Sequence, residues 1–252
     1  MSLQIDPFAH HPELREKIAD PAGSFFRKLT VDMLLQQFPQ LTRLREWVHD
    51  DDFREANRAQ ALADHSGDLW VFGYGSLMWD PALFFSEVRR AHVDGFARRL
   101  ILIDDKGGRG TQEAPGLMAA LDHGGECHGL AFRIPAPDVD TETEVLWRRE
   151  VIGPGYIPQF VTARIGDETV PALTFLADHA VPEIRDDLSR ADQIRFLAHG
   201  SGVLGTSREY LANIVDHFET LEIRDDDCAA LLHEVDTYLA SLPSSPPNEA
   251  DT

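Results

Sequence analysis

WVFGYGSLMW, residues 70–79, joins a short apolar run to a glycine-rich loop. The run 69–72 is typical of a buried strand, and Gly73 interrupts it. Glycines on both sides of Tyr74 let main-chain N–H groups approach a ligand closely, and consecutive N–H groups form a concave site for a carboxylate or an oxyanion. From these residues alone, a plain exit from a strand into a turn is the simpler interpretation.

Beyond this loop, strand-like patterns continue to about residue 178. Glycine turns separate two pairs of apolar runs, with Gly124-Gly125 in the first pair and Gly166-Asp167 in the second, and this spacing predicts two hairpins. The strand candidates are 96–103, 117–121, 127–134, 160–165 and 170–175.

Helix signals lie between the hairpins and after them. Thr141 and Glu144 form a candidate capping box for a helix that reaches Glu150. Three more helices are predicted to start at Ser189, at Thr206 with Glu209, and at Asp225. The pattern indicates an α+β fold, in which a small mixed β-barrel or curled sheet is packed against helices.

Three regions differ in composition. Residues 1–67 are charge-rich and predict a helical N-terminal extension, with Thr30 capping a short helix and Asp50 to Asp52 as a solvated helix start or turn. Residues 68–240 are expected to form the main domain. Residues 241–252 are rich in proline and serine and are expected to be a disordered tail.

The charge balance limits the choice of partner. The 252 residues contain 43 Asp and Glu against 23 Lys and Arg, a net charge of −20. Such a charge repels phosphate backbones and anionic lipids, so neither nucleic acid nor a membrane surface is an expected partner. Neither a secretion signal nor an apolar run long enough for a membrane span is evident, and we expect a cytoplasmic protein. The oligomeric state stays open.

Two other kinds of site match less well. Gly200-x-Gly202-x-x-Gly205 has the string of a dinucleotide fingerprint, but a helix rather than a strand is predicted before it, and we interpret it as a loop between helices. Ser76 lacks the G-x-S-x-G context of a hydrolase nucleophile, because Met78 stands where the second glycine is needed.

Neither a metal centre nor a thiol nucleophile is expected. His123, Cys127 and His128 lie close in the sequence, but neighbouring residues on a strand point to opposite faces, which separates Cys127 from His128. Cys228 falls on the predicted inner face of a helix. Two cysteines make no disulfide framework.

Four blocks in order along the chain resemble the ChaC-type γ-glutamylcyclotransferases. They are WVFGYGSLMW at 70–79, RGTQEAPGL at 109–117, LWRRE at 146–150 with Gly155-Tyr156, and residues 200–213 with Glu209-Tyr210-Leu211. The resemblance covers about residues 68–240. It departs from the family pattern at Gln112, where a proline is expected, and in 151–155.

The resemblance implies that the chain cleaves glutathione, γ-Glu-Cys-Gly, into 5-oxoproline and Cys-Gly as a carbon–nitrogen lyase without a cofactor. The α-amine of the substrate attacks its own γ-carbonyl, so nucleophile and electrophile are already tethered. The enzyme must still take a proton from the α-ammonium and deliver one to the leaving amine. One carboxylate can do both in turn, and the resemblance implies Glu150 for this role.

The resemblance also implies a set of substrate-binding residues. They are Phe72, Gly73, Tyr74, Gly75, Ser76, Leu77, Arg109, Tyr156 and Tyr210. The loop would offer N–H groups to the α-carboxylate or the oxyanion, and Arg109 would steer an anionic substrate. For the two later tyrosines a half-buried core position is the alternative, and for Arg109 a surface position. Arg148 and Arg149 are expected to be helix-surface charges or ion-pair partners.

Three rival functions stay open at this point. The first is the same cyclisation on another γ-glutamyl amino acid or amine. The second is a non-catalytic γ-glutamyl-binding regulatory protein, against which the retention of Glu150 beside an intact loop argues. The third is a protein-interaction module that uses residues 1–67.

Overall fold

A computed structural model describes residues 6–41 and 43–243 of the chain. The predicted tail therefore lies outside the described residues from 244 onward, whereas Ser241 is still helical. In the described part of the chain, no helix is both long enough and apolar enough to cross a membrane.

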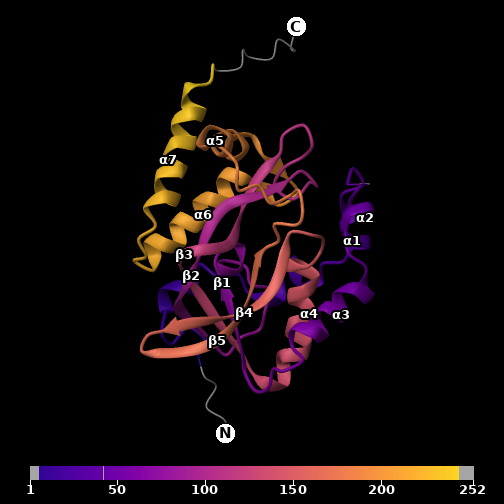
Figure 1. The fold of residues 1–252 in the computed structure, drawn as a ribbon, viewed down its shortest axis with the longest axis vertical. Helices are drawn as coiled ribbons and strands as arrows, with labels where there is room; N and C mark the ends of the chain where they lie inside the picture. Colours follow the sequence, from indigo (N-terminus) through magenta and orange to yellow (C-terminus); the bar gives the residue numbers. More distant parts are fainter. Residues whose placement is uncertain (1–5, 42, 244–252) are drawn as a thin grey trace.

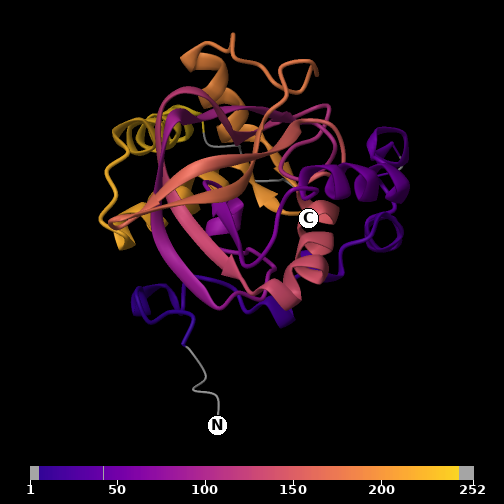
Figure 2. The same ribbon diagram turned by 60° about the horizontal axis from the view of Figure 1, so that its bottom comes forward.

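Five strands form a closed barrel, which confirms the predicted fold class. The strands are β1 (Leu69–Gly73), β2 (Glu87–Asp104), β3 (Gly116–Ile134), β4 (Tyr156–Ile165) and β5 (Glu168–Ala177). Their order is β1-β3-β2-β4-β5, and a short parallel pairing of β1 with β5 closes the ring. Figure 2 shows the long strands curving around into this ring.

The second predicted hairpin is confirmed, but the first one is wrong. β4 and β5 pair on either side of Gly166-Asp167, as expected. Gly124 and Gly125, by contrast, lie inside the continuous strand β3, both with φ of +89°. They stand opposite Gly95, where the register of β2 against β3 shifts. Glycine at positive φ thus forms an irregularity that bends a long barrel strand rather than a turn that ends it.

Helix α4 (Val139–Glu150) follows β3 and lies against the N-terminal helix α3 (Asp51–Ala61) (Figure 1). The predicted capping box at Thr141 and Glu144 is wrong, because the helix already begins at Val139 after the turn η5 (Ala136–Asp138). The helix prediction itself is right, and Glu150 is the last helical residue.

The C-terminal helices cover the other side of the barrel (Figure 1). They are α5 (Arg190–His199), α6 (Ser207–Thr220) and α7 (Asp226–Ser241). Ser189, Thr206 and Asp225 cap them, and Thr206 with Glu209 forms the full capping box, so all three predicted starts are confirmed. A small hairpin of β6 (Ser201–Gly202) and β7 (Gly205–Thr206) connects α5 to α6.

The N-terminal residues wrap around the barrel rather than extending from it. Besides α3 they form α1 (Val31–Gln37), α2 (Leu44–Trp47) and the turns η1 (Pro12–Leu14), η2 (Pro21–Gly23) and η3 (Phe26–Lys28). Thr30 caps α1 and Asp50 caps α3. Leu14 and Ile18 are buried in the same core as the barrel strands. This part of the chain therefore contributes to the core of the folded protein.

Candidate active site

A cavity of about 190 Å³ lies where the end of α4, the start of β4, helix α6 and the N-terminal residues meet. Five of the ten site residues inferred from the sequence line it: Ser76, Arg109, Glu150, Tyr156 and Tyr210. They come from five separate places in the chain, and the barrel brings them together.

Glu150 reaches the cavity because α4 ends at this residue. Its side chain is 12% exposed, and burial raises the pKa of its carboxyl group above the ordinary value. The neighbouring guanidinium of Arg149 opposes this rise, because a positive charge favours the ionised carboxylate. A carboxyl group with a raised pKa holds its proton more tightly than an exposed glutamate does, which suits it to act in turn as a base and as an acid.

Arg149 is not the surface charge that the sequence suggested as one of two options. Its side chain is 3% exposed, and its Nε lies 2.8 Å from Oε1 of Glu150. The same guanidinium donates to Oγ of Ser76 at 2.8 Å and to the carbonyl of Asp80. One buried cation therefore links the carboxylate to the glycine-rich loop. Arg148, next to it, pairs with Glu144 on the outer face of the helix.

The loop 72–77 turns from β1 into the short helix η4 (Ser76–Met78) directly beside the cavity. Of its six residues only Ser76 lines the cavity, whereas Phe72 and Leu77 are buried in the core. The hydroxyl of Tyr210 packs so close to Gly75 that no side chain fits there, because a Cβ built on Gly75 would lie 2.5 Å from that hydroxyl. The loop and α6 thus pack against each other through a position that admits no side chain.

Three tyrosines surround this end of the barrel. The hydroxyl of Tyr156 donates to the carbonyl of Ala119 at 2.8 Å, and the N–H of Ala119 donates to the hydroxyl of Tyr210 at 3.3 Å. Tyr74 donates to the carbonyl of Phe175 and does not line the cavity. Burial raises the pKa of Tyr210 to about 12, so it is a neutral phenol at physiological pH.

Arg109 is buried, so the surface alternative does not hold. Its backbone N–H donates to the side chain of Asp104, its guanidinium reaches the carbonyl of Thr206 at 3.2 Å, and it lies 5.5 Å from the ring centre of Tyr210. Burial lowers the pKa of Arg109. Arg109 therefore adds a second buried guanidinium to the cavity besides that of Arg149.

The glycine string at 200–205 packs against the loop that precedes Arg109. It follows helix α5 rather than a strand, so it is not a dinucleotide-binding loop. The N–H groups of Val203 and Leu204 donate to the carbonyls of Gly107 and Gly108, at 2.8 Å each. A Cβ on Gly202 would lie 2.4 Å from the same two carbonyl oxygens. The β6–β7 hairpin needs glycine because its backbone packs directly onto the backbone of the loop before Arg109.

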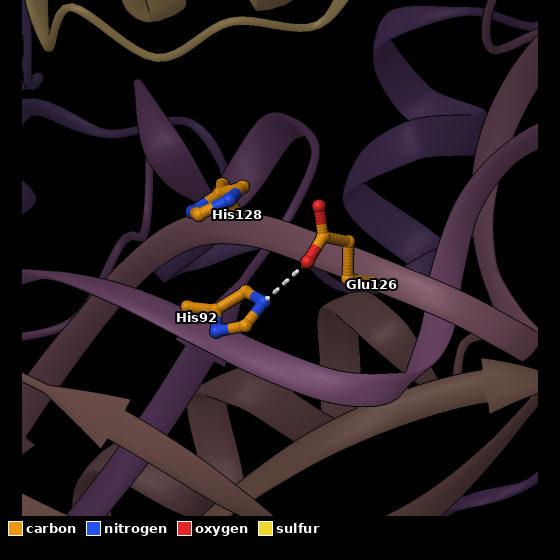
Figure 3. Close-up of side chains that lie close together, drawn as sticks. All are labelled: His92, Glu126 and His128. Atoms are coloured by element: carbon orange, nitrogen blue, oxygen red, sulfur yellow. Dashed lines mark hydrogen bonds and ion pairs between the residues drawn. The ribbon is translucent and has the colours of Figure 1, made fainter.

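Outside the cavity, His92, Glu126 and His128 bring three metal-ligand side chains together on β2 and β3 (Figure 3). The two imidazole rings stack with centres 4.5 Å apart. Arg164 lies 2.9 Å from Nδ1 of His92, and because arginine only donates, Nδ1 accepts and the proton of His92 sits on Nε2. Nε2 lies 3.2 Å from Oε2 of Glu126 and donates to it in this tautomer. In this arrangement His92 has no free lone pair for a metal ion.

Among the lining residues that the sequence analysis does not assign to the cavity, two groups matter here. One is Arg149, for which the ion-pair alternative is confirmed by its contact with Glu150, and its place next to Glu150 at the end of a helix is a usable signal. The other group belongs to the N-terminal residues and has no motif. It consists of Phe25, Phe26, Leu29, Leu34, Leu41, Leu44 and Trp47.

Comparisons with known proteins point in one direction. The family model described as "ChaC-like protein" matches residues 69–238. A protein of Escherichia coli K12 named "Glutathione-specific gamma-glutamylcyclotransferase" is 39% identical over 191 residues, which cover 74% of this chain and 82% of that protein. The human "Glutathione-specific gamma-glutamylcyclotransferase 1" is 32% identical over 179 residues, covering 68% of this chain and 80% of its own.

A solved structure matches the fold. The crystal structure of a yeast γ-glutamyl cyclotransferase specific to glutathione aligns with a TM-score of 0.63 at 20% identity. The alignment covers 69% of this chain and 97% of the yeast chain. At this identity the match concerns the architecture alone.

Proposed function

The chain belongs to the ChaC-like protein family, and we propose from this membership that it is a glutathione-specific γ-glutamylcyclotransferase, an enzyme that degrades glutathione. The observation that carries the proposal is the buried pair of Arg149 and Glu150, which lies in a cavity beside Ser76, Tyr156 and Tyr210. The curated relatives from E. coli and human carry this activity in their names.

The reaction needs no group beyond the substrate and a proton carrier. The α-amine nitrogen forms a bond to the γ-carbonyl carbon, the bond from that carbon to the cysteine nitrogen breaks, and the products are 5-oxoproline and Cys-Gly. Two protons leave the attacking nitrogen, one from the α-ammonium before the attack and one after the new bond has formed. The departing nitrogen gains two protons and leaves as the ammonium group of Cys-Gly. Holding the substrate in a bent conformation supplies much of the rate, since well-oriented intramolecular attack lowers a barrier by up to about 7–11 kcal/mol.

We assign the proton transfer to Glu150. The ionised carboxylate takes a proton from the attacking nitrogen, and the resulting acid delivers it to the departing nitrogen. The same carboxylate can carry both protons in turn. Burial brings the pKa of this group closer to that of the amine, which makes the transfer easier than it is for an exposed glutamate. Arg149 holds Oε1 by its ion pair and leaves Oε2 for the substrate.

The remaining cavity residues are suited to the zwitterionic end of the glutamyl group. The hydroxyl of Tyr210 accepts from the N–H of Ala119, so its own proton is free for a carboxylate or for the oxyanion. The hydroxyl of Tyr156 donates to the carbonyl of Ala119, so its oxygen is free to accept from the α-ammonium. Ser76 and Arg109 add a hydroxyl and a positive charge, and we propose the 72–77 backbone as a further donor.

We also propose that the enzyme works in the cytoplasm. Cys127 and Cys228 are both free and buried, which is compatible with a reducing compartment.

The assignment is tested by following the products from glutathione with the purified full chain. We expect 5-oxoproline and Cys-Gly, and we expect neither from the Glu150→Gln variant above a small residual rate. Turnover of other γ-glutamyl dipeptides at a higher kcat/KM than glutathione would contradict the glutathione specificity and leave the cyclisation chemistry in place.

A further inference from the structure

Seven of the residues that line the cavity are apolar residues from the N-terminal part of the chain. We call these residues the N-terminal wall: Phe25, Phe26, Leu29, Leu34, Leu41, Leu44 and Trp47. All seven precede residues 69–238, the region that the family model matches. The wall is therefore a feature of this chain that the four family blocks do not describe.

The wall is fixed to the barrel domain at both ends. Arg27 pairs with both oxygens of Glu142 on α4, at 2.7 and 2.8 Å. At the other end, Nε1 of Trp47 donates to Glu183 at 3.0 Å, and the N–H of His49 donates to the carbonyl of Ile152 at 2.9 Å. Charge-assisted and buried contacts of this kind hold the wall in one position relative to Glu150.

Two wall residues close the cavity by direct contact with its rim. A Cβ on Gly107 would lie 2.2 Å from Cδ2 of Leu41, and a Cβ on Gly153 would lie 2.6 Å from the ring of Trp47. Both glycines thus leave room for a wall side chain. Leu41 and Trp47 are also partly exposed, whereas Leu29, Leu34 and Leu44 are buried.

The distribution of polar groups orients the substrate in this space. Ser76, Arg149 and Glu150 are joined by a hydrogen bond and an ion pair, and Arg109 lies against the ring of Tyr210, so these lining residues form one polar group. Lys106 and Glu183 also line the cavity, and both lie beside Trp47 of the wall. The α-ammonium and α-carboxylate of a γ-glutamyl compound need such partners, because burying an unpaired charge is costly. The leaving amine, with the cysteine side chain beside it, must then extend toward the wall.

We propose that the N-terminal wall is the leaving-group subsite of the enzyme, and that Leu41 and Trp47 limit the size of the cysteine side chain that it accepts. The inference rests on the proposed function. A free thiol is small and polarisable and fits against an apolar surface. A long alkyl group on the sulfur would collide with the Trp47 ring or the Leu41 methyl groups.

The test compares glutathione with S-hexylglutathione as substrates of full-length variants, by the amount of 5-oxoproline formed. The wall variants are Leu41→Ala and Trp47→Ala. Their matched controls are Leu35→Ala and Phe38→Ala, because these two residues belong to the same apolar cluster and do not line the cavity. Trp47→Phe keeps most of the ring and loses only the hydrogen bond to Glu183.

We expect the wild type to favour glutathione. We expect each wall variant to raise the ratio of kcat/KM for S-hexylglutathione to that for glutathione by about 10-fold or more, the range that apolar pocket contacts provide. The controls and Trp47→Phe should keep the wild-type ratio. Because a ratio is measured within one variant, loss of stability that lowers both rates does not affect it.

Three results would overturn the inference. The first is a wild type that accepts both substrates equally, and the second is an unchanged ratio in both wall variants. The third is an equal rise in the control variants, which would indicate general loosening. If the wild type forms no 5-oxoproline from either compound, the proposed function itself has failed and the subsite assignment fails with it.

Discussion

Nε of Arg149 lies 2.8 Å from Oε1 of Glu150, although the two residues are consecutive in the sequence. Neighbouring residues in a regular helix point in different directions and do not normally pair. Here the helix ends at Glu150, and the next residue has left helical geometry, with φ −111° and ψ 35°. The helix end therefore lets the carboxylate turn back onto the guanidinium, which fixes it beside the cavity.

The first prediction concerns Glu150 as the proton carrier. Glu150→Gln should lower kcat for glutathione by about 10²- to 10⁴-fold, the usual contribution of a general acid–base group. The matched control is Glu144→Gln on the exposed face of the same helix, which should keep wild-type turnover. Turnover within a few-fold of wild type in the Glu150 variant would remove it from the mechanism.

The second prediction follows from the raised pKa of the same group. Because burial raises the pKa of Glu150, the folded state prefers the protonated acid. This preference stabilises the fold fully below the ordinary glutamate pKa and is lost as the pH rises through the raised value. Glutamine mimics the protonated acid at every pH. At about pH 8 the urea midpoint of Glu150→Gln should therefore be at least as high as that of wild type, and at about pH 4 the difference should shrink. A clearly lower midpoint at pH 8 would contradict the direction of the shift.

The third prediction concerns the role of Arg149. Its positive charge lowers the pKa of Glu150 and so opposes burial. Arg149→Met should move the acid limb of kcat/KM to higher pH, since the free carboxyl group then ionises later. Arg148→Met is the control, because that guanidinium pairs with Glu144 instead. A merely structural role would lower the rate at all pH values and leave the limb where it is.

The fourth prediction uses the contact between Gly75 and Tyr210. Gly75→Ala should destabilise the protein and lower activity, because the new methyl group would lie 2.5 Å from the tyrosine hydroxyl. Adding Tyr210→Phe removes that oxygen, and the nearest remaining ring atom lies at an ordinary 3.6 Å. Thermal unfolding of the double variant should thus show less destabilisation than the sum of the two single variants. Gly23→Ala, with no atom within 4 Å of the added Cβ, serves as the control. Additive effects would mean that the loop and α6 are not coupled through this contact.

The fifth prediction concerns the anchor of the N-terminal wall. Arg27→Met should lower the free energy of unfolding by about 3–5 kcal/mol, because it leaves the buried carboxylate of Glu142 unpaired. Replacing Glu142 by leucine as well should recover part of this loss. Arg45→Met breaks a pair with Asp32 that is exposed on both sides, and it should cost less than about 1 kcal/mol. Chemical denaturation measures the three variants against wild type, and equal losses for Arg27→Met and Arg45→Met would argue against a buried anchor.

Local signals were sufficient for much of the fold. The predicted helix caps at Thr30, Ser189, Thr206 and Asp225 are confirmed. In each cap the side chain accepts a hydrogen bond from a backbone N–H three residues later, so the interaction is local in the sequence. The Gly-Gly pair at 124–125 misled because glycine at positive φ serves both a turn and a bend in a long strand. Only the pairing of β3 with β2 on both sides of the glycines distinguishes the two.

The site was only partly readable from the sequence. The family blocks point to ten residues, of which Ser76, Arg109, Glu150, Tyr156 and Tyr210 line one cavity. The other five, Phe72, Gly73, Tyr74, Gly75 and Leu77, do not line it. The sequence does not predict that the N-terminal wall lines the cavity. The wall residues, from Phe25 to Trp47, have no reactive or charged side chains, and they lie at least 100 positions before Glu150. Long-range packing of ordinary apolar residues has no motif, so only the folded structure reveals it.

The most direct measurement of the central claim is the product balance from glutathione with the purified full-length protein. Intramolecular attack predicts 5-oxoproline and Cys-Gly in equal amounts, with no free glutamate. Glutamate together with Cys-Gly would mean that water rather than the α-amine attacks the γ-carbonyl, and it would contradict the account.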